Sequence, residues 1–178
     1  FSGLSQSKKM FTAEVEFDSN GSKMNILHPF KESKHMFYLN FKENYFDCKL
    51  HVSCGNFNID DNCTTGVLDY GRGYWPYNNM WYWGNNSFIL NGIRIGWNLG
   101  YGFGICKDSE NIIYYDNKSY KIGTISSTID INDPMKSYTI DSNDGAIHLE
   151  LIPFYDNYSK TKIFWIKSFT SPSILGTL

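Results

Sequence analysis

The chain has 178 residues, which is enough for one domain with a substantial buried core. Aromatic residues make up 17% of it and charged residues 19%, a composition that excludes intrinsic disorder. A formal net charge of −2 argues against the large basic surface that binding to nucleic acid or to an anionic membrane requires. No apolar run approaches the roughly 18 residues of a membrane-spanning helix, so we expect no membrane span.

Short runs with the alternation of β-strands follow one another along the chain, and helical periodicity is almost absent. Residues 11–17 alternate and end at a polar turn. We expect two further strands at residues 35–41 and 48–52, joined through residues 42–47.

The second half of the chain predicts three hairpins and a last strand. Asn91-Gly92 is the dipeptide that a two-residue type I′ turn requires, the next hairpin has a four-residue turn, and the third turns around Asp144-Gly145. This organisation predicts a single all-β domain over residues 1–178, either an antiparallel barrel or a partly open barrel or sandwich. The hairpins lie at residues 88–99, 111–123 and 138–154, and the last strand lies at residues 162–169.

The cysteine and histidine spacings predict neither a metal site nor a cofactor site. Four cysteines permit two disulfides, but they lack the paired short intervals of a structural zinc site, and a chain this rich in aromatic residues does not need the cross-links. We therefore expect free thiols in a reducing compartment. With no targeting segment visible, we expect that compartment to be the cytoplasm. The four histidines lie far apart and form no ligand pattern.

The most informative stretch is LDYGRGYWPYNNMWYWG at residues 68–84, in which seven of seventeen residues are Tyr or Trp. Arg72 lies in this stretch between two glycines, and nearly all other positively charged residues of the chain are Lys. Tyr and Trp rings suit ordinary cores as well as ligand pockets. We predict a pocket wall in which Arg72 pairs with a carboxylate such as Asp69, because an unpaired guanidinium among rings carries a large desolvation penalty. The rings against which it would pack are Trp75, Trp81 and Trp83.

Strand alternation adds a second group of polar side chains. Arg94, Gly96 and Asn98 share one strand face, opposite an apolar one. Glu110 and Glu150 each lie on a half-polar face of another segment. Such faces are either exposed to solvent or line a pocket, and for Arg94, Asn98 and Glu110 both interpretations remain open.

Several motifs at once resemble the uncharacterised family known as domain of unknown function 2804. They are GVLDYGRGYWPYNNMWYWG, NGIRIGWNLGYGFG, SENIIYYDNKSYKI and SNDGAIHLELIP, and they match in order and spacing over residues 66–153. Family members are nearly twice as long, so the resemblance implies that this chain is a fragment of a longer domain, truncated at both ends. It also implies a relation to lipocalin-like (calycin) β-barrels, including the carotenoid-hydratase and tocopherol-cyclase relatives.

The resemblance assigns motif positions but no established activity. Tyr70 and Tyr74 depart from the family pattern, and neither change removes an ionisable motif residue. The motif falls on Asp69, Gly71, Arg72, Trp75, Trp81, Trp83, Asn98, Gly100, Glu110, Asn111, Asp144, Gly145 and Glu150.

Three functions remain open, and they leave it uncertain whether the protein is an enzyme. The first is a lipocalin-like binding domain for an amphipathic or isoprenoid-like small molecule. The second is an enzyme that hydrates or cyclises such a molecule, with a carboxylic acid as proton donor. The third is a purely structural ion network formed by the two arginines with Asp69 and Glu110. The ligand-binding candidates are Arg72, Trp75, Trp81, Trp83, Arg94, Asn98, Glu110 and Asn111, and the catalytic candidates are Glu110, Glu150 and Asp69.

Truncation of a longer β domain has a further implication. Strands that lose their neighbours expose unpaired N–H and C=O groups along an edge. We therefore expect such an edge to promote association with a partner.

Overall fold

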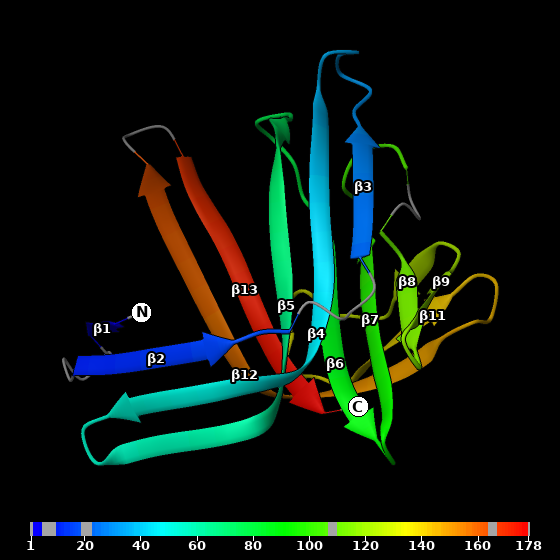
Figure 1. The fold of residues 1–178 in the computed structure, drawn as a ribbon. Coiled ribbons are helices and arrows are strands. Elements are labelled where there is room, and N and C mark those ends of the chain that lie inside the picture. The colour runs from blue at the N-terminus through cyan, green and yellow to red at the C-terminus, as the bar shows by residue number, and fades with distance from the viewer. Residues whose placement is uncertain (1, 5–9, 19–22, 107–109, 164–166, 178) are drawn as a thin grey trace. The chain divides into compact units, whose positions relative to one another are not determined.

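The computed structural model describes residues 2–4, 10–18, 23–106, 110–163 and 167–177, and among these it describes side chains between residues 10 and 155. These residues form antiparallel sheets and contain no helix (Figure 1). The chain divides into two compact units, Phe1–Ile122 and Gly123–Leu178, which are considered one at a time. The predicted all-β antiparallel class is confirmed, and the prediction of a single domain stays a prediction.

The first unit contains two sheets. One has the order β1-β2-β4-β3, with β5 paired along nearly the whole length of β4 on its other edge, and the second has the order β6-β7-β8-β9. The strands are β1 (Ser2–Leu4), β2 (Met10–Glu16), β3 (Lys23–Pro29), β4 (Phe37–Cys54), β5 (Phe57–Tyr74), β6 (Tyr82–Leu90), β7 (Ile93–Tyr101), β8 (Ile112–Tyr115) and β9 (Lys118–Lys121).

The second unit is one sheet in which sequential strands are neighbours. Its order is β10-β11-β12-β13, and the hairpin predicted around Asp144-Gly145 joins β11 to β12. The strand predicted at 162–169 includes residues 164–166, which lie outside the described residues, and its described ends belong to β12 and β13. The strands are β10 (Ile125–Ser127), β11 (Tyr138–Ser142), β12 (His148–Ile163) and β13 (Lys167–Thr177).

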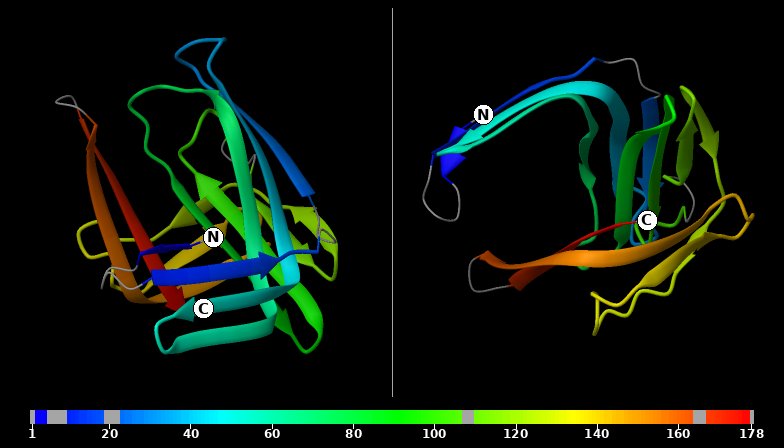
Figure 2. Two further views of the ribbon diagram at one scale, coloured as in Figure 1. Left: turned by 60° about the vertical axis from the view of Figure 1, so that its left-hand side comes forward. Right: turned by 90° about the horizontal axis from the view of Figure 1, so that it is seen from below.

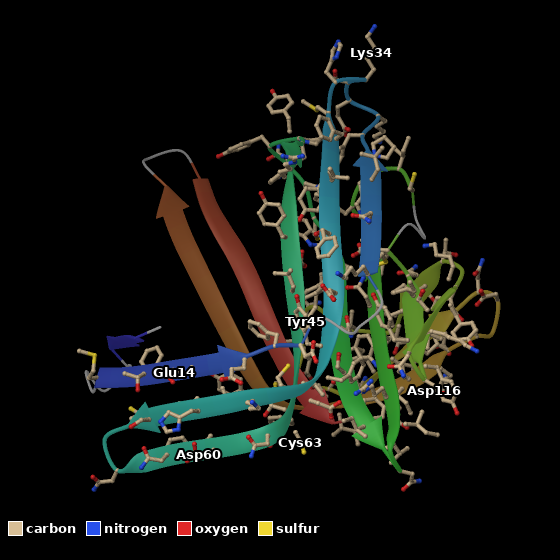
Figure 3. All side chains as sticks on the ribbon, in the orientation of Figure 1. Glu14, Lys34, Tyr45, Asp60, Cys63 and Asp116 are labelled. Atoms are coloured by element: carbon tan, nitrogen blue, oxygen red, sulfur yellow. The ribbon has the colours of Figure 1, made fainter. Side chains whose placement is uncertain are left out.

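Strand β4 corrects the prediction of two strands joined through a connection. It runs without interruption from Phe37 to Cys54 and turns sharply midway, where Asp47 has a positive φ of 58°. Its register with β5 shifts between Tyr45 and Cys48 and again after Cys48, the signature of β-bulges. Tyr45 lies close to this turn (Figure 3). A bulge absorbs the extra residues without ending the strand, and sequence alternation alone does not reveal it.

Two tight turns define the second sheet. Asn91 and Gly92 have φ values of 51° and 80° and connect paired residues Leu90 and Ile93, so the predicted two-residue hairpin turn is confirmed. The four-residue turn predicted between β8 and β9 is wrong, because Tyr115 pairs with Lys118 across Asp116-Asn117. Both of these residues have positive φ, a conformation that Asp and Asn tolerate better than most residues.

The two sheets of the first unit pack face to face. Met24 and Ile26 of β3 form one apolar cluster with Ile112 and Tyr114 of β8. Farther along, the Asn44 amide of β4 donates hydrogen bonds to Ser87 Oγ (2.6 Å) and to the Asn86 carbonyl (3.2 Å) of β6. We call the side of the first sheet that faces β6–β8 its inner face and the opposite side its outer face.

No sheet closes into a barrel within the described ranges, so the closed-barrel form of the predicted fold is wrong. The first sheet keeps three edge strands, β1, β3 and β5, and each of the other two sheets keeps two. Figure 2 shows the first sheet curving along β4 and β5, which removes the far part of this hairpin from the second sheet. The result for the first unit is a pair of facing antiparallel sheets with open edges.

The Tyr114 hydroxyl allows an experimental test of the packing between the two sheets. It is buried and has no hydrogen-bond partner among the described residues. Leaving such a group unpaired costs about 1–3 kcal/mol. We therefore expect Tyr114→Phe to keep or raise the free energy of unfolding in urea at neutral pH, whereas exposed Tyr115→Phe should leave it unchanged. A clear loss of stability in Tyr114→Phe would show that the hydroxyl has a partner.

The Tyr114→Phe substitution also gives a test that depends on pH. Burial, and secondarily the charge of Glu43, raise the pKa of Tyr114 from 10.0 to about 12. Between these two pH values the folded state holds a proton that the unfolded state has lost, so the stability due to this group falls as pH rises. Tyr114→Phe should therefore lose less stability above pH 10 than the wild type.

Candidate functional site

A buried ammonium group lies at the centre of the inner face. Lys42 has a side chain only 3% exposed, and its Nζ lies 3.1 Å from Glu110 Oε2 and 3.3 Å from Asp69 Oδ2. Asp69 is opposite Lys42 in the β4–β5 ladder, whereas Glu110 comes from the segment before β8. The Glu110 side chain is 7% exposed and that of Asp69 is 33% exposed, so the cluster opens to solvent on the Asp69 side. Two carboxylates on one ammonium give these three groups a net charge of −1.

Asn98 and Trp83 extend this cluster along β7 and β6. The fully buried Asn98 amide donates to the Glu110 backbone carbonyl (2.8 Å) and to Glu110 Oε2 (3.4 Å). Its oxygen accepts a hydrogen bond from Trp83 Nε1 at 2.9 Å. Lys42 Nζ lies 4.6 Å from the centre of the Trp83 ring, a cation–π distance. We call Lys42, Asp69, Trp83, Asn98 and Glu110 the Lys42 cluster.

Gly100 provides the space for the Glu110 side chain. A Cβ atom at Gly100 would collide with the carboxylate and with Cγ of Glu110. The Gly100 N–H donates to Asn111 Oδ1 at 2.8 Å, and Asn111 is fully buried. Asn111, a predicted ligand-binding residue, therefore hydrogen-bonds to the Gly100 backbone, against which the Glu110 side chain packs.

An aromatic group adjoins the Lys42 cluster and centres on buried Phe103. The nearest rings are those of Trp81 at 4.9 Å and Tyr38 at 5.0 Å between centroids. Phe103 lies in a loop between Gly102 and Gly104, whose φ values of 92° and 70° are in the region that favours glycine. This loop is held by the Ile105 N–H, which donates to the Pro29 carbonyl at 3.0 Å. The remaining rings around Phe103 are His28, Phe30 and Trp75.

The two groups influence each other electrostatically. Burial, and then the negative charges of Asp69 and Glu110, raise the pKa of the Tyr38 hydroxyl. Burial lowers the pKa of His28, and the Glu110 charge opposes this shift only in part. Both side chains are therefore favoured in their neutral forms beside the carboxylates.

The structure brings together most of the predicted site residues on one side of the first sheet. Asp69, Trp83, Asn98 and Glu110 meet at Lys42, and Trp75 and Trp81 meet at Phe103. The co-facial arrangement predicted for Arg94, Gly96 and Asn98 agrees with the pairing of β7 with β6. Their roles in binding a ligand stay predictions.

The predicted anchoring of Arg72 among the tryptophans is wrong. Arg72 lies opposite Leu39 on the outer face, where it is exposed, and within the described residues it has no ion-pair partner. The neighbouring Gly71 faces inward, and the Tyr38 ring occupies the space that its side chain would fill. Strand alternation therefore separates Arg72 from Asp69, and the cation that meets the carboxylates is Lys42.

Among the described residues, Arg94 and Glu150 make no contact that would include them in the Lys42 cluster as it is defined within the first unit. Arg94 binds Asp47 and donates to Asn117 Oδ1 at 3.0 Å. Glu150 belongs to β12 in the second unit and is exposed. The predicted ion network combined both arginines with Asp69 and Glu110. In the structure these two carboxylates pair with Lys42 instead, and Lys42 is the single cation of the cluster.

Sequence reasoning missed Lys42, Tyr38 and Phe103. A signal was present, because Tyr38, Asn40, Lys42 and Asn44 alternate along one face of β4. Leu39 and Phe41 alternate with them, and an apolar set ordinarily marks the buried side of a strand. Here the polar set is buried instead.

No metal or membrane element emerges from the described part of the chain. It contains no group of three or more His, Cys, Asp or Glu placed to hold a metal ion, and all four cysteines are free. Nor does it contain a helix of the length and apolar character needed to cross a membrane.

Comparison with known protein families gives a match over nearly the whole chain. The family model described as Domain of unknown function (DUF2804) matches residues 2–174, nearly the whole chain. No curated protein and no solved structure matches the chain.

Removal of the buried ammonium should destabilise the fold. Lys42→Met leaves Glu110 buried without its cation, which costs about 3–5 kcal/mol in comparable pairs. Lys49→Met removes a cation from the same strand, but its partner Glu16 is exposed, so little change is expected. Urea unfolding of both variants measures the difference, and adding Glu110→Gln to Lys42→Met should recover part of the loss. Equal, small effects of the two lysine variants would contradict a buried ion pair.

Gly100 should tolerate no side chain. Gly100→Ala forces Glu110 away from its position, and overpacking of this kind costs about 1–3 kcal/mol. The matched control is Gly66→Ala, whose Cβ would meet Cys48 Sγ at an ordinary 3.8 Å. Thermal melts should show a lower midpoint for Gly100→Ala and an unchanged or higher one for Gly66→Ala, and the reverse order would refute the close approach.

Proposed function

Because the chain belongs to the family described as Domain of unknown function (DUF2804), which brings no activity with it, we propose a function from the chemistry of the Lys42 cluster. The protein is a binding domain for an amphipathic, isoprenoid-like small molecule. The polar end of that molecule carries a hydrogen-bond donor or a positive charge, and its apolar body lies on the tryptophan rings.

The observation that carries this proposal is the unbalanced charge of the cluster. Lys42 is shared by two carboxylates, and Asp69 is the one that solvent reaches. A cation on a ligand would neutralise the excess charge, and a neutral donor would hydrogen-bond to the Asp69 carboxylate, without disturbing the Lys42–Glu110 pair. Asn40 also favours a ligand that carries a donor or a positive charge. Its side-chain oxygen is buried on the same strand face as Lys42, and it has no hydrogen-bond partner among the described residues.

Accessible aromatic surface supports the apolar half of the ligand. Trp75, Trp81 and Trp83 are 41, 49 and 44% exposed although each touches the buried groups described above. Large rings with one buried edge and one free face are the usual lining of small-molecule sites. A lipocalin-like origin of the scaffold belongs to this proposal and accords with the antiparallel sheets of the first unit.

The two other functions account for fewer of these features. An acid catalyst would have to release a proton from Glu110, but Glu110 Oε2 accepts hydrogen bonds from Lys42 and Asn98. A purely structural ion network explains the Lys42–Glu110 pair but not the exposed Asp69 carboxylate beside free tryptophan faces. Binding is therefore the function that the geometry supports best.

Three probes with one apolar body separate the functions. Geranylamine, geraniol and geranate carry an ammonium, a hydroxyl and a carboxylate on the same isoprenoid chain, and tryptophan fluorescence reports their binding. We expect affinity to fall in that order. Asp69→Asn should weaken geranylamine about fivefold and should affect geraniol less.

The control keeps the same substitution on the same strand. Asp60→Asn removes an exposed carboxylate of β5 that pairs with His51, and it should leave all three affinities unchanged. A structural network predicts that none of the probes binds. Equal binding of all three, or no effect of Asp69→Asn, would refute the proposed role of the cluster.

A further inference from the structure

The outer face of the first sheet carries apolar side chains where a solvated face is normally polar. Leu39 and Phe41 of β4 point outward because Asn40 and Lys42 point inward. The register places Asn25 of β3 and Tyr70 of β5 on either side of Phe41, and Arg72 beside Leu39. Three adjacent strands thus contribute side chains to one continuous surface.

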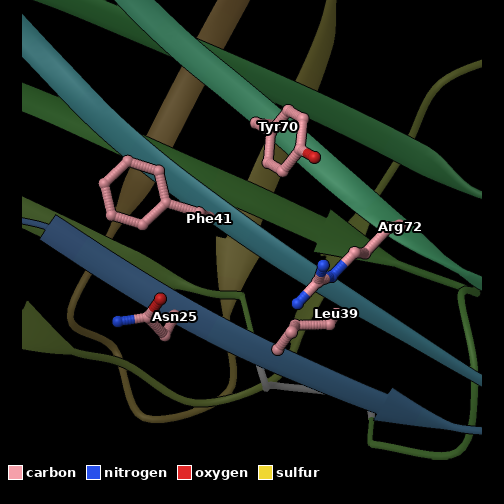
Figure 4. A pocket seen from close by; sticks show the side chains of 5 residues that line it. All are labelled: Asn25, Leu39, Phe41, Tyr70 and Arg72. Carbon is pink, nitrogen blue, oxygen red and sulfur yellow. The ribbon is translucent and has the colours of Figure 1, made fainter.

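This surface is hollowed into a pocket of about 240 Å³ lined by five residues of β3, β4 and β5. Figure 4 shows their side chains on the near side of these strands, with the second sheet behind. The Arg72 guanidinium reaches over Leu39, and the rings of Phe41 and Tyr70 lie on adjacent strands. The lining residues are Asn25, Leu39, Phe41, Tyr70 and Arg72.

The polar side-chain groups that line this pocket make no hydrogen bond or ion pair with other described residues. Within the part of the chain that the structure describes, the Arg72 guanidinium, the Tyr70 hydroxyl and the Asn25 amide have no hydrogen-bond or ion-pair partner. Arg72 is also the single cation of the pocket lining. A planar, permanently charged fork beside two rings matches a carboxylate attached to an apolar or aromatic body.

We propose that the outer pocket around Arg72 is a second binding site, for a small carboxylate with an aromatic ring. The carboxylate pairs with the Arg72 guanidinium, and the ring packs against Phe41 and Tyr70 over Leu39. The volume lies below the roughly 300–1,000 Å³ of sites for drug-sized ligands, which selects a single-ring molecule. The Lys42 cluster has the opposite charge preference and lies on the other face, so this site does not depend on the function proposed above.

Phenylacetate and its uncharged analogue phenylacetamide test the charge preference. Titrations followed by backbone amide NMR should show phenylacetate shifting the signals of Leu39, Phe41, Tyr70 and Arg72, with the Trp83 indole signal unmoved. Phenylacetamide should bind at least about tenfold more weakly. Shifts centred on Trp83, or equal binding of the two probes, would overturn the proposal.

Substitutions at Arg72 complete the test. Arg72→Gln should lower phenylacetate affinity at least about tenfold, and Arg72→Lys should recover only part of it. Lys34→Gln, which removes an exposed cation from the loop between β3 and β4, should change nothing. Because Arg72 is exposed and unpaired, all three variants should melt as the wild type does. Retained affinity in Arg72→Gln would overturn the proposal.

The alternative occupant of an apolar sheet face is a second copy of the chain. Sedimentation without any probe distinguishes it. A monomer whose affinity for phenylacetate is independent of protein concentration supports the small-ligand site. Self-association that is lost in Phe41→Ser and competes with phenylacetate would assign the face to a dimer and overturn the proposal.

Discussion

The first unit depends on the placement of one ammonium group between its two sheets. Lys42 comes from β4 and Glu110 from the segment that leads into β8, so their contact ties one sheet to the other. An effective desolvation penalty of several kcal/mol for a buried charge is offset only where the partner is close and hydrogen-bonded in turn. Asn98 supplies that support through Glu110, and Gly100 leaves the space for it. The pair therefore fixes how the two sheets meet.

Much of the fold could be predicted from local sequence. Asn91-Gly92 is sufficient to place a hairpin turn, because few other dipeptides adopt two successive positive φ angles without strain. Alternation correctly placed Arg94, Gly96 and Asn98 on one side of β7. The continuity of β4 could not be predicted, because the bulges near Tyr45 and Cys48 arise from pairing with a partner strand.

Most residues of the site could be predicted from the sequence, but its central cation, Lys42, could not. Arg72 attracted attention because arginine is scarce in this chain, and its flanking glycines suggested space around it. Gly71 in fact accommodates the Tyr38 ring on the inner face, and Arg72 points the other way. Which face of a strand is buried is decided by the other sheet. A lysine among polar neighbours gives no local sign that a carboxylate distant in sequence will meet it.

The inverted polarity of β4 has a consequence for how the chain reaches this structure. A slip of one residue in its pairing would turn Leu39 and Phe41 inward and Lys42 outward, since side chains alternate with period two. For most strands such an error exposes apolar surface, but here it would bring Leu39 and Phe41 to the inner face in place of Asn40 and Lys42. The apolar side chains of this stretch therefore do not by themselves select the native alignment. Discrimination falls to polar side chains such as Lys42 and Asn44, which meet Glu110 and Ser87 in the native alignment.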